Sequence, residues 1–71
     1  MTGTIKTLVR DRGFGFITSE ATGRDHFFHW AAVIGVRLEE LSIGERVLFD
    51  EEPSDRGPRA TNVRPLDDTK G

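Results

Sequence analysis

Aromatic and histidine side chains gather in one part of the sequence, in two short runs joined by a polar link. The two runs are Arg12-Gly13-Phe14-Gly15-Phe16-Ile17 and Asp25-His26-Phe27-Phe28-His29-Trp30. They hold five of the six aromatic residues of the chain and both of its histidines. Aromatic rings can stack on flat ligands such as unpaired bases, and a histidine can stack, donate a hydrogen bond or bind a metal ion. Residues 12–30 are therefore the main candidates for a functional site in this chain.

The spacing within the two runs assigns their side chains to faces, because alternate residues of a strand point the same way. Phe14 and Phe16 share one face of the first run, and Phe27 and His29 share one face of the second. The opposite face of the second run is expected to carry His26, Phe28 and Trp30. If the two runs pair as antiparallel strands, one flat aromatic platform results, formed by Phe14, Phe16, Phe27 and His29.

The aromatic platform could belong to the core or to an exposed binding face. Gly13 and Gly15 alternate with the phenylalanines and have nothing to bury, which favours a platform that is itself the core. Glycine in a strand also permits the curvature and close approach that a small barrel needs. Arg12 and Thr18 lie on the face of Phe14 and Phe16, and such polar neighbours favour a face that contacts solvent. The pattern alone leaves both interpretations open.

Length and composition limit the possible classes. A chain of 71 residues forms one small domain, and without cysteine it has no disulfide or thiolate metal site. The absence of a long apolar run predicts no membrane span and no secretory signal, so we expect a cytoplasmic protein. A net charge of -2 argues against a strong general polyanion binder. The half that holds the aromatic residues is the less acidic one, however, which favours nucleic acid at that face.

The rest of the sequence predicts further strands and little helix. Strands are expected over residues 4–10, 14–19, 25–30, 45–51 and 59–64. Ile5 of the first strand should point inward, and Val47 and Phe49 should share one face of the fourth. Phe28 and Phe49 are expected in the core. Residues 67–71 form a polar tail.

Two finer expectations concern the second half of the chain. Ile34, Leu38 and Leu41 are spaced as on one helix face, which predicts a turn or two of helix between residues 31 and 44. Ala60 and Val63 should lie on opposite faces of the fifth strand.

Five short strands, with one longer connection after the third, predict an all-β fold. The natural candidate is a five-stranded antiparallel Greek-key barrel, the oligonucleotide-binding fold, whose binding face lies on its second and third strands. The aromatic residues fall on those two strands. The expected fold therefore favours an exposed platform.

The chain also resembles a protein family. It is similar to the cold-shock proteins, as a single cold-shock domain over residues 1–66. The first run matches the family's first ribonucleoprotein motif, with Arg12 for the commoner lysine. The run that follows Asp25 matches the second motif, usually written Val-Phe-Val-His-Phe. The resemblance continues through Arg56-Gly57-Pro58, Ala60, Asn62 and Val63. The RNA-recognition-motif fold shares part of the first motif, but it needs two packed helices for which no segment has the length.

The resemblance implies a monomer without a cofactor that binds single-stranded RNA and DNA with low sequence specificity and acts as an RNA chaperone. Phe14, Phe16 and Phe27 would stack on bases, and His29 would stack or hydrogen-bond. The full set of implied nucleic-acid-binding residues is Lys6, Arg12, Phe14, Phe16, Phe27, His29, Trp30, Arg56 and Pro58.

Two positions depart from the family pattern. Thr7-Leu8-Val9 stands where the family usually has Trp-Phe-Asn, so an aromatic residue is missing at Thr7. Leu38 stands where the connecting loop often supplies another aromatic residue. Each lost stacking site would weaken binding by roughly 1–3 kcal/mol. We therefore expect shorter or weaker binding sites than those of a typical relative.

Two other functions would use the same face. The same face could serve a transcription antiterminator, or the exposed rings could bind a protein partner in a protein-interaction barrel. An enzyme is not expected, because no nucleophile with an adjacent base, no phosphate loop and no suitably placed carboxylate pair is found. A metal site is not expected either, since His26 and His29 fall on opposite faces of a strand and lack a third ligand.

Overall fold

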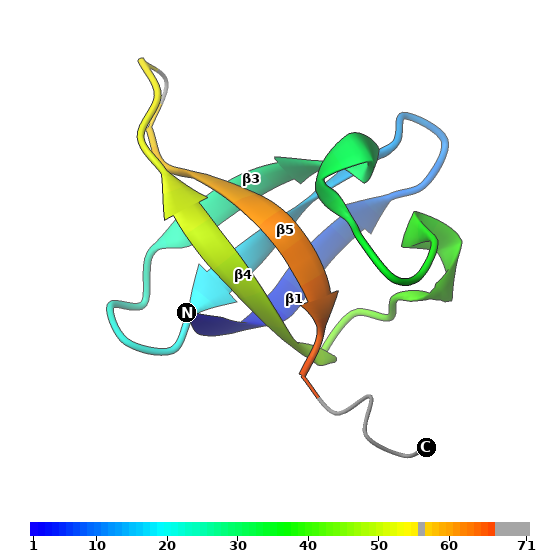
Figure 1. The fold of residues 1–71 in the computed structure, drawn as a ribbon, viewed down its shortest axis with the longest axis horizontal. Coiled ribbons are helices and arrows are strands. Elements are labelled where there is room, and N and C mark those ends of the chain that lie inside the picture. Colours follow the sequence, from blue (N-terminus) through cyan, green and yellow to red (C-terminus); the bar gives the residue numbers. More distant parts are fainter. Residues whose placement is uncertain (56, 67–71) are drawn as a thin grey trace.

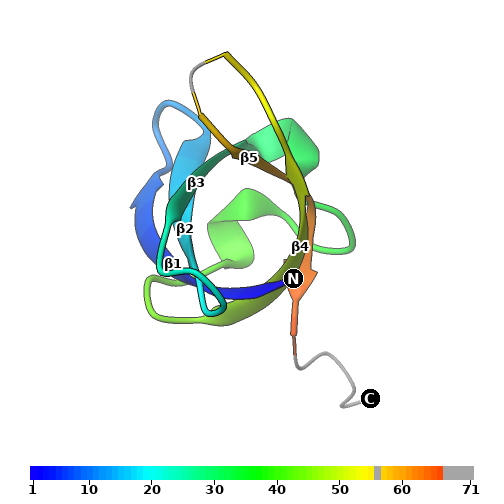
Figure 2. The ribbon, with the colours of Figure 1, turned by 90° about the vertical axis from the view of Figure 1, so that its left-hand side faces the viewer.

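Five strands close into a barrel in the part of the chain that the computed structural model describes, residues 1–55 and 57–66. The strands are β1 (Thr2–Val9), β2 (Phe14–Ser19), β3 (Asp25–His29), β4 (Arg46–Glu52) and β5 (Arg59–Pro65) (Figure 1). Their order around the barrel is β1-β2-β3-β5-β4, and a view turned by 90° shows them as a ring (Figure 2). The predicted all-β barrel is confirmed. The tail expected over residues 67–71 lies outside the described residues.

The strands pair mainly with antiparallel neighbours. β2 lies between β1 and β3, and β4 pairs with both β1 and β5, all antiparallel. The barrel closes where β3 meets β5 in parallel, through the pair Phe27 and Arg59. We call this contact the closing seam. Among the strands of the described residues it is the one pairing that departs from the predicted antiparallel arrangement, and an isolated parallel bridge also joins Val33 to Val63 of β5.

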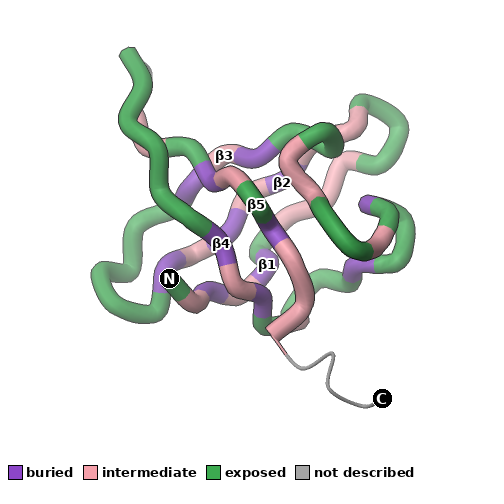
Figure 3. Tube along the Cα trace, in the orientation of Figure 1, coloured by how far each residue is buried: buried purple, intermediate pink, exposed green. Residues whose placement is uncertain are grey.

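The core lies inside this ring and follows the alternation of the strands (Figure 3). Its buried apolar residues are Ile5, Ile17, Phe28, Leu38, Leu41, Val47, Phe49, Ala60 and Val63. Ile5, Phe28 and Phe49 were predicted to point inward, and each is at most 1% exposed. Burying one large apolar side chain of this kind contributes about 1.5–3 kcal/mol to folding.

Gly15 explains why the platform faces outward. A Cβ atom at this position would lie 2.5 Å from the carbonyl oxygen of Thr7 and 2.9 Å from the ring of Phe28. The inner face of β2 therefore holds a glycine because β1 and the Phe28 ring already fill the space beside it. With that face occupied, Phe14 and Phe16 must lie on the outside of the barrel. The close contacts of Gly15 with β1 and with Phe28 thus decide that the aromatic platform lies on the surface and not in the core.

Trp30 was expected to be the last residue of the third strand, but it lies outside that strand. β3 ends at His29, and Trp30 begins a short 3₁₀ helix, η1 (Trp30–Ala32). The Nδ1 atom of His29 accepts a hydrogen bond from the backbone N–H of Ala31 at 3.3 Å, which caps this helix. Trp30 is therefore 58% exposed and does not share the inner face with His26 and Phe28.

The connection after η1 also differs from the expected amphipathic helix. Gly35 has a φ of 82°, a left-handed conformation that interrupts helical structure. A second short 3₁₀ helix, η2 (Leu38–Glu40), follows it. Leu38 and Leu41 are buried, but Ile34 is 44% exposed. Of the three residues expected on one helix face, only Leu38 and Leu41 are thus buried together, and they lie one 3₁₀ turn apart.

The prediction that Ala60 and Val63 lie on opposite faces of β5 is wrong, because both are buried in the core. Asn62 between them has a φ of 52°, and the pairing of β4 with β5 shifts register between Leu48 and Asp50. Such a bulge adds one residue to the strand and interrupts its alternation. Asparagine tolerates this left-handed conformation better than most residues do.

Candidate nucleic-acid interface

The aromatic platform lies on the outer face of β2 and β3. Phe16 pairs with Phe27 across the two strands, and Phe14 pairs with His29. The ring centroid of Phe27 lies 5.5 Å from that of Phe14 and 5.8 Å from that of Phe16, and the centroids of Phe14 and Phe16 are 6.2 Å apart. These phenylalanine rings therefore form one continuous surface in which Phe27 contacts both of the others.

The platform is not flat. The ring planes of Phe14 and Phe27 are inclined by 34°, those of Phe16 and Phe27 by 71°, and those of Phe14 and Phe16 by 89°. Edge-to-face contacts are favoured because the positive edge of one ring meets the negative face of another. The rings thus offer differently inclined faces, which suit bases that are splayed apart.

Trp30 extends the aromatic surface beyond His29. Its ring centroid lies 5.5 Å from that of His29. A Cβ atom at Gly13 would lie 2.6 Å from Cδ1 of Trp30, and the Trp30 backbone N–H donates to the Gly13 carbonyl at 2.8 Å. Gly13 thus provides the space that the indole ring covers. The sequence alone does not predict this role, because it depends on the β1–β2 turn lying next to η1 in the fold.

Lys6 lies at the edge of the platform but is already paired. Its ammonium group donates to Oδ2 of Asp25 at 2.8 Å, and the Thr18 hydroxyl donates to Oδ1 at 2.9 Å. These two hydrogen bonds hold the pKa of Asp25 below its usual value. A phosphate group that contacts Lys6 would therefore have to compete with a fixed carboxylate.

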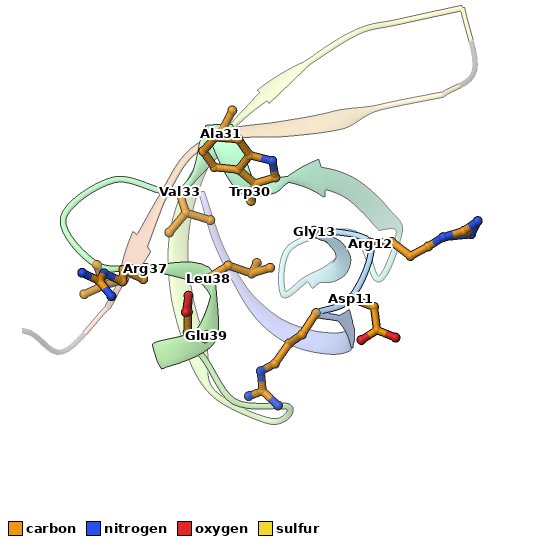
Figure 4. A pocket seen from close by; sticks show the side chains of 11 residues that line it. Asp11, Arg12, Gly13, Trp30, Ala31, Val33, Arg37, Leu38 and Glu39 are labelled. Carbon is orange, nitrogen blue, oxygen red and sulfur yellow. The ribbon is translucent and has the colours of Figure 1, made fainter.

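Arg12 is exposed in the turn between β1 and β2, and its side chain points away from the neighbouring hollow (Figure 4). Arg56, the other arginine implied by the family resemblance, lies outside the described residues.

Two hollows open at the two ends of the aromatic surface. The first, which we call the turn pocket, has a volume of about 530 Å³ and lies between the β1–β2 turn, Trp30 and Leu38 (Figure 4). The second, the hairpin groove, has a volume of about 580 Å³. Phe16 and Phe27 form one wall of the hairpin groove. The other wall comes from the β4–β5 hairpin and consists of Ser54, Asp55, Gly57, Pro58 and Arg59. Pro58 is thereby brought to the platform from a distant part of the sequence.

The two departures from the family pattern lie in different environments. Thr7 pairs with Phe16 across β1 and β2 and is half-buried on the platform side. An aromatic residue there would adjoin the platform. Leu38 is only 9% exposed and packs in the core, where it also borders the turn pocket. It is therefore not a shortened stacking residue on the surface, contrary to our expectation.

The sequence did not reveal the role of His26. Its ring lies on the inner face of β3 and is 1% exposed. The Nε2 atom lies 3.3 Å from Oε2 of Glu51 on β4. His29 is exposed on the outer face, so the two histidines lie apart as predicted. Within residues 1–55 and 57–66, no group of three or more His, Cys, Asp or Glu side chains is placed to hold a metal ion.

The helices of the described residues are η1 and η2, and neither is long and apolar enough to cross a membrane.

Comparison with known proteins relates the chain to one family. The family described as 'Cold-shock' DNA-binding domain matches residues 1–66. The chain is 49% identical over 63 residues to Cold shock protein 2 of Lactiplantibacillus plantarum, which covers 89% of this chain and 94% of that protein. It is 42% identical over 64 residues to the Cold shock-like protein of Aquifex aeolicus, with coverage of 90% and 91%.

A solved structure supports the same relationship. The barrel is similar to a chain described as drosophila Unr CSD456, with a TM-score of 0.75 and 27% sequence identity. The match covers 99% of this chain and 28% of the other, so the present barrel corresponds to one part of a longer chain.

Proposed function

The chain belongs to the cold-shock domain family, and from this premise we propose that it binds single-stranded RNA and DNA by stacking bases on the aromatic platform. The family consists of nucleic-acid-binding proteins, and the chain is not an enzyme.

The continuous outer surface of Phe14, Phe16 and Phe27 carries this proposal. Every base has a π-face, so stacking on aromatic rings tolerates any sequence and contributes about 1–3 kcal/mol per base. Bases inside a duplex are covered by their neighbours and cannot reach such a surface. The inclined rings support binding of unpaired, splayed bases with low sequence specificity.

The remaining site residues surround this surface. We assign His29 and Trp30 to stacking at one end, because both are exposed and their rings are in contact. Pro58 serves at the other end as part of the hairpin groove. Lys6 and Arg12 are assigned to phosphate or base-edge contacts, and Arg56 is assigned to the same role from the family resemblance.

The biological effect that we propose is that of an RNA chaperone. A protein that binds only the unpaired state of an RNA shifts the equilibrium away from base-paired structures by mass action. This requires no nucleotide hydrolysis, and we propose that the protein acts as a monomer in the cytoplasm. Antitermination of transcription would use the same face, because it also depends on keeping RNA single-stranded.

The experiment is fluorescence anisotropy of labelled pyrimidine-rich RNA and DNA oligonucleotides, with a duplex of the same sequence as control. It is run at two salt concentrations and repeated with Phe14→Ala. The proposal expects salt-sensitive binding of both single strands, weak binding of the duplex and a marked loss in the variant. Salt-independent behaviour or absence of binding by the folded protein would instead favour the protein-interaction barrel, since phosphate contacts always bring salt dependence.

A further inference from the structure

A side-chain contact lies next to the closing seam of the barrel. The seam pairs Phe27 of β3 with Arg59 of β5. His26 directly precedes Phe27, and Glu51 of β4 pairs with Ala60, which directly follows Arg59. The contact between His26 and Glu51 thus lies one residue away from the seam, but it joins β3 to β4 and passes beside β5, which lies between them. We call this contact the His26–Glu51 link.

The surroundings of His26 make the link depend on a proton. Nε2 lies 3.3 Å from the Glu51 carboxylate, and Nδ1 lies 3.2 Å from the carbonyl oxygen of Arg24. Both ring nitrogens therefore face oxygen acceptors. A protonated imidazole donates to both, whereas a neutral imidazole carries one N–H and leaves a lone pair facing the other oxygen.

The two partners of the link differ in how freely they can move. The His26 ring is 1% exposed and packs 5.1 Å from the ring of Phe49, so the barrel holds it in place. The Glu51 side chain is 41% exposed and can turn toward water when it is not held. Loss of the ring proton removes the positive charge that attracts the Glu51 carboxylate and leaves at most a neutral hydrogen bond, so that the side chain, and with it the β4–β5 hairpin, is held less tightly.

That hairpin forms one wall of the hairpin groove. Ser54, Asp55, Gly57, Pro58 and Arg59 face Phe16 and Phe27 across it. Among the described residues, the backbone pairing that directly joins β3 to β5 is the Phe27–Arg59 pair. The His26–Glu51 link lies beside this pair and adds a side-chain restraint between β3 and the β4–β5 hairpin.

We propose that His26 is a positioning residue, whose protonated ring holds Glu51 and thereby sets the width of the hairpin groove beside Phe27. This inference rests on the proposed function in that the groove belongs to the nucleic-acid interface. It adds a pH dependence: the groove is held at lower pH and loosened as the pH rises and the ring loses its proton.

The other groups around His26 do not change charge in the same range. Ile17 of β2, which pairs with His26, and Phe49 of β4 are apolar, and Ala60 of β5 lies opposite Glu51. Asp25 on the same strand is held by Lys6 and Thr18, and its lowered pKa keeps it ionised. Carboxylates normally ionise below about pH 5, whereas histidine changes charge between about pH 5 and pH 8.

His29 needs a control of its own, because it lies on the outer face and histidine side chains in general change charge in this range. Its protonation would attract phosphate directly without any movement of the hairpin. All measurements are therefore made in a His29→Gln background as well. Glu51→Gln is the main test variant, since this exposed residue can be replaced without emptying the core. His26→Gln is a second variant, which keeps one donor but cannot be protonated.

The first measurement uses the free protein, so that it does not depend on nucleic-acid binding. Amide and imidazole NMR resonances are followed from about pH 5.5 to about pH 8.5. We expect the amides of Asp55, Gly57 and Arg59 to shift together with the His26 ring, and to stop following it in Glu51→Gln. A His26 ring that keeps one protonation state over this range, or hairpin amides that do not follow it, overturns the inference.

The second measurement is the affinity for a short single-stranded RNA at the two ends of that pH range. In the His29→Gln background we expect binding about fivefold tighter at the lower pH, and no such difference once Glu51→Gln is added. An affinity that keeps its pH dependence in the double variant overturns the positioning role. If the unmodified protein and every variant fail to bind RNA while the hairpin amides still follow His26, the link is supported and the proposed function is rejected.

Discussion

Phe27 is the residue whose loss should damage binding most, because its ring makes the two shortest ring contacts of the platform. Its centroid lies 5.5 Å from Phe14 and 5.8 Å from Phe16. It also borders the hairpin groove, so it contributes to stacking and to the groove at once. We predict that Phe27→Ala weakens the binding of a short single-stranded oligonucleotide strongly and destabilises the barrel only moderately.

The expected magnitude follows from the contacts that are lost. One stacked base contributes about 1–3 kcal/mol, which corresponds to an increase in Kd of about 5-fold to 150-fold. Two aromatic contacts within the platform disappear as well. Each contributes about 0.5–1.5 kcal/mol, so the free energy of unfolding should fall by about 1–3 kcal/mol.

Anisotropy titration with labelled RNA measures the affinity, and thermal unfolding followed by circular dichroism checks the fold. Phe27→Leu is the matched variant, because it keeps apolar volume and removes the π-face. Ile43→Ala removes an apolar side chain that is 65% exposed and lies outside the platform, so it should bind like the unmodified protein. A folded Phe27→Ala protein with unchanged Kd would refute the stacking argument.

Three further changes test other parts of the structure. Thr7→Trp should tighten RNA binding by about 1–3 kcal/mol, because position 7 adjoins the platform; anisotropy that shows equal affinity would reject the missing-site hypothesis. Asp25→Asn should release Lys6, raise affinity and steepen its salt dependence, and an unchanged slope would show that Lys6 contacts no phosphate. The pKa of Asp25 is lowered in the folded protein, so its ion pair with Lys6 stabilises the fold at any pH above the pKa of the unfolded state. This stabilisation is lost as the pH falls through the folded-state pKa, and the free energies of unfolding of wild type and variant should therefore converge at low pH. Gly15→Ala should destabilise the barrel severely, since its Cβ would lie 2.5 Å from a backbone oxygen, and a wild-type Tm would contradict the close approach.

The parts of the fold that could be predicted depend on local alternation. Ile5, Phe28 and Phe49 were placed in the core because period-two patterns in short strands survive in the structure. The orientation of Phe14 and Phe16 was settled less directly. It required the inference of a barrel, and its physical cause, the Phe28 ring beside Gly15, is a contact between different strands.

The errors arose where a single residue changes the backbone. Asn62 adopts a left-handed conformation and places Ala60 and Val63 on the same side of β5. His29 caps η1 through its side chain and thereby ends β3 before Trp30. Neither event has a signature in a period-two pattern, because an asparagine in a strand usually keeps the extended conformation, and His29 keeps it and acts through its side chain alone.

The side-chain contacts that were missed join distant parts of the chain. Glu51 reaches His26 because only β5 separates β3 from β4 around the barrel, and their separation in sequence gives no hint of it. Lys6 and Asp25 are likewise 19 residues apart and meet only through the register of β1, β2 and β3. Alternation predicted which face each of these strands exposes, but closure of the barrel decided which side chains meet.

Trp30 allows the central proposal to be tested directly, because it is the only tryptophan of the sequence and is 58% exposed at the end of the platform. Its fluorescence is recorded while a short single-stranded RNA is added, with a duplex of the same sequence as control. If bases stack on the aromatic surface, emission should be quenched by the single strand in a saturable manner, with the same Kd as the anisotropy titration, and hardly at all by the duplex. Unchanged emission during binding that anisotropy detects would place the RNA elsewhere on the barrel and contradict the stacking proposal.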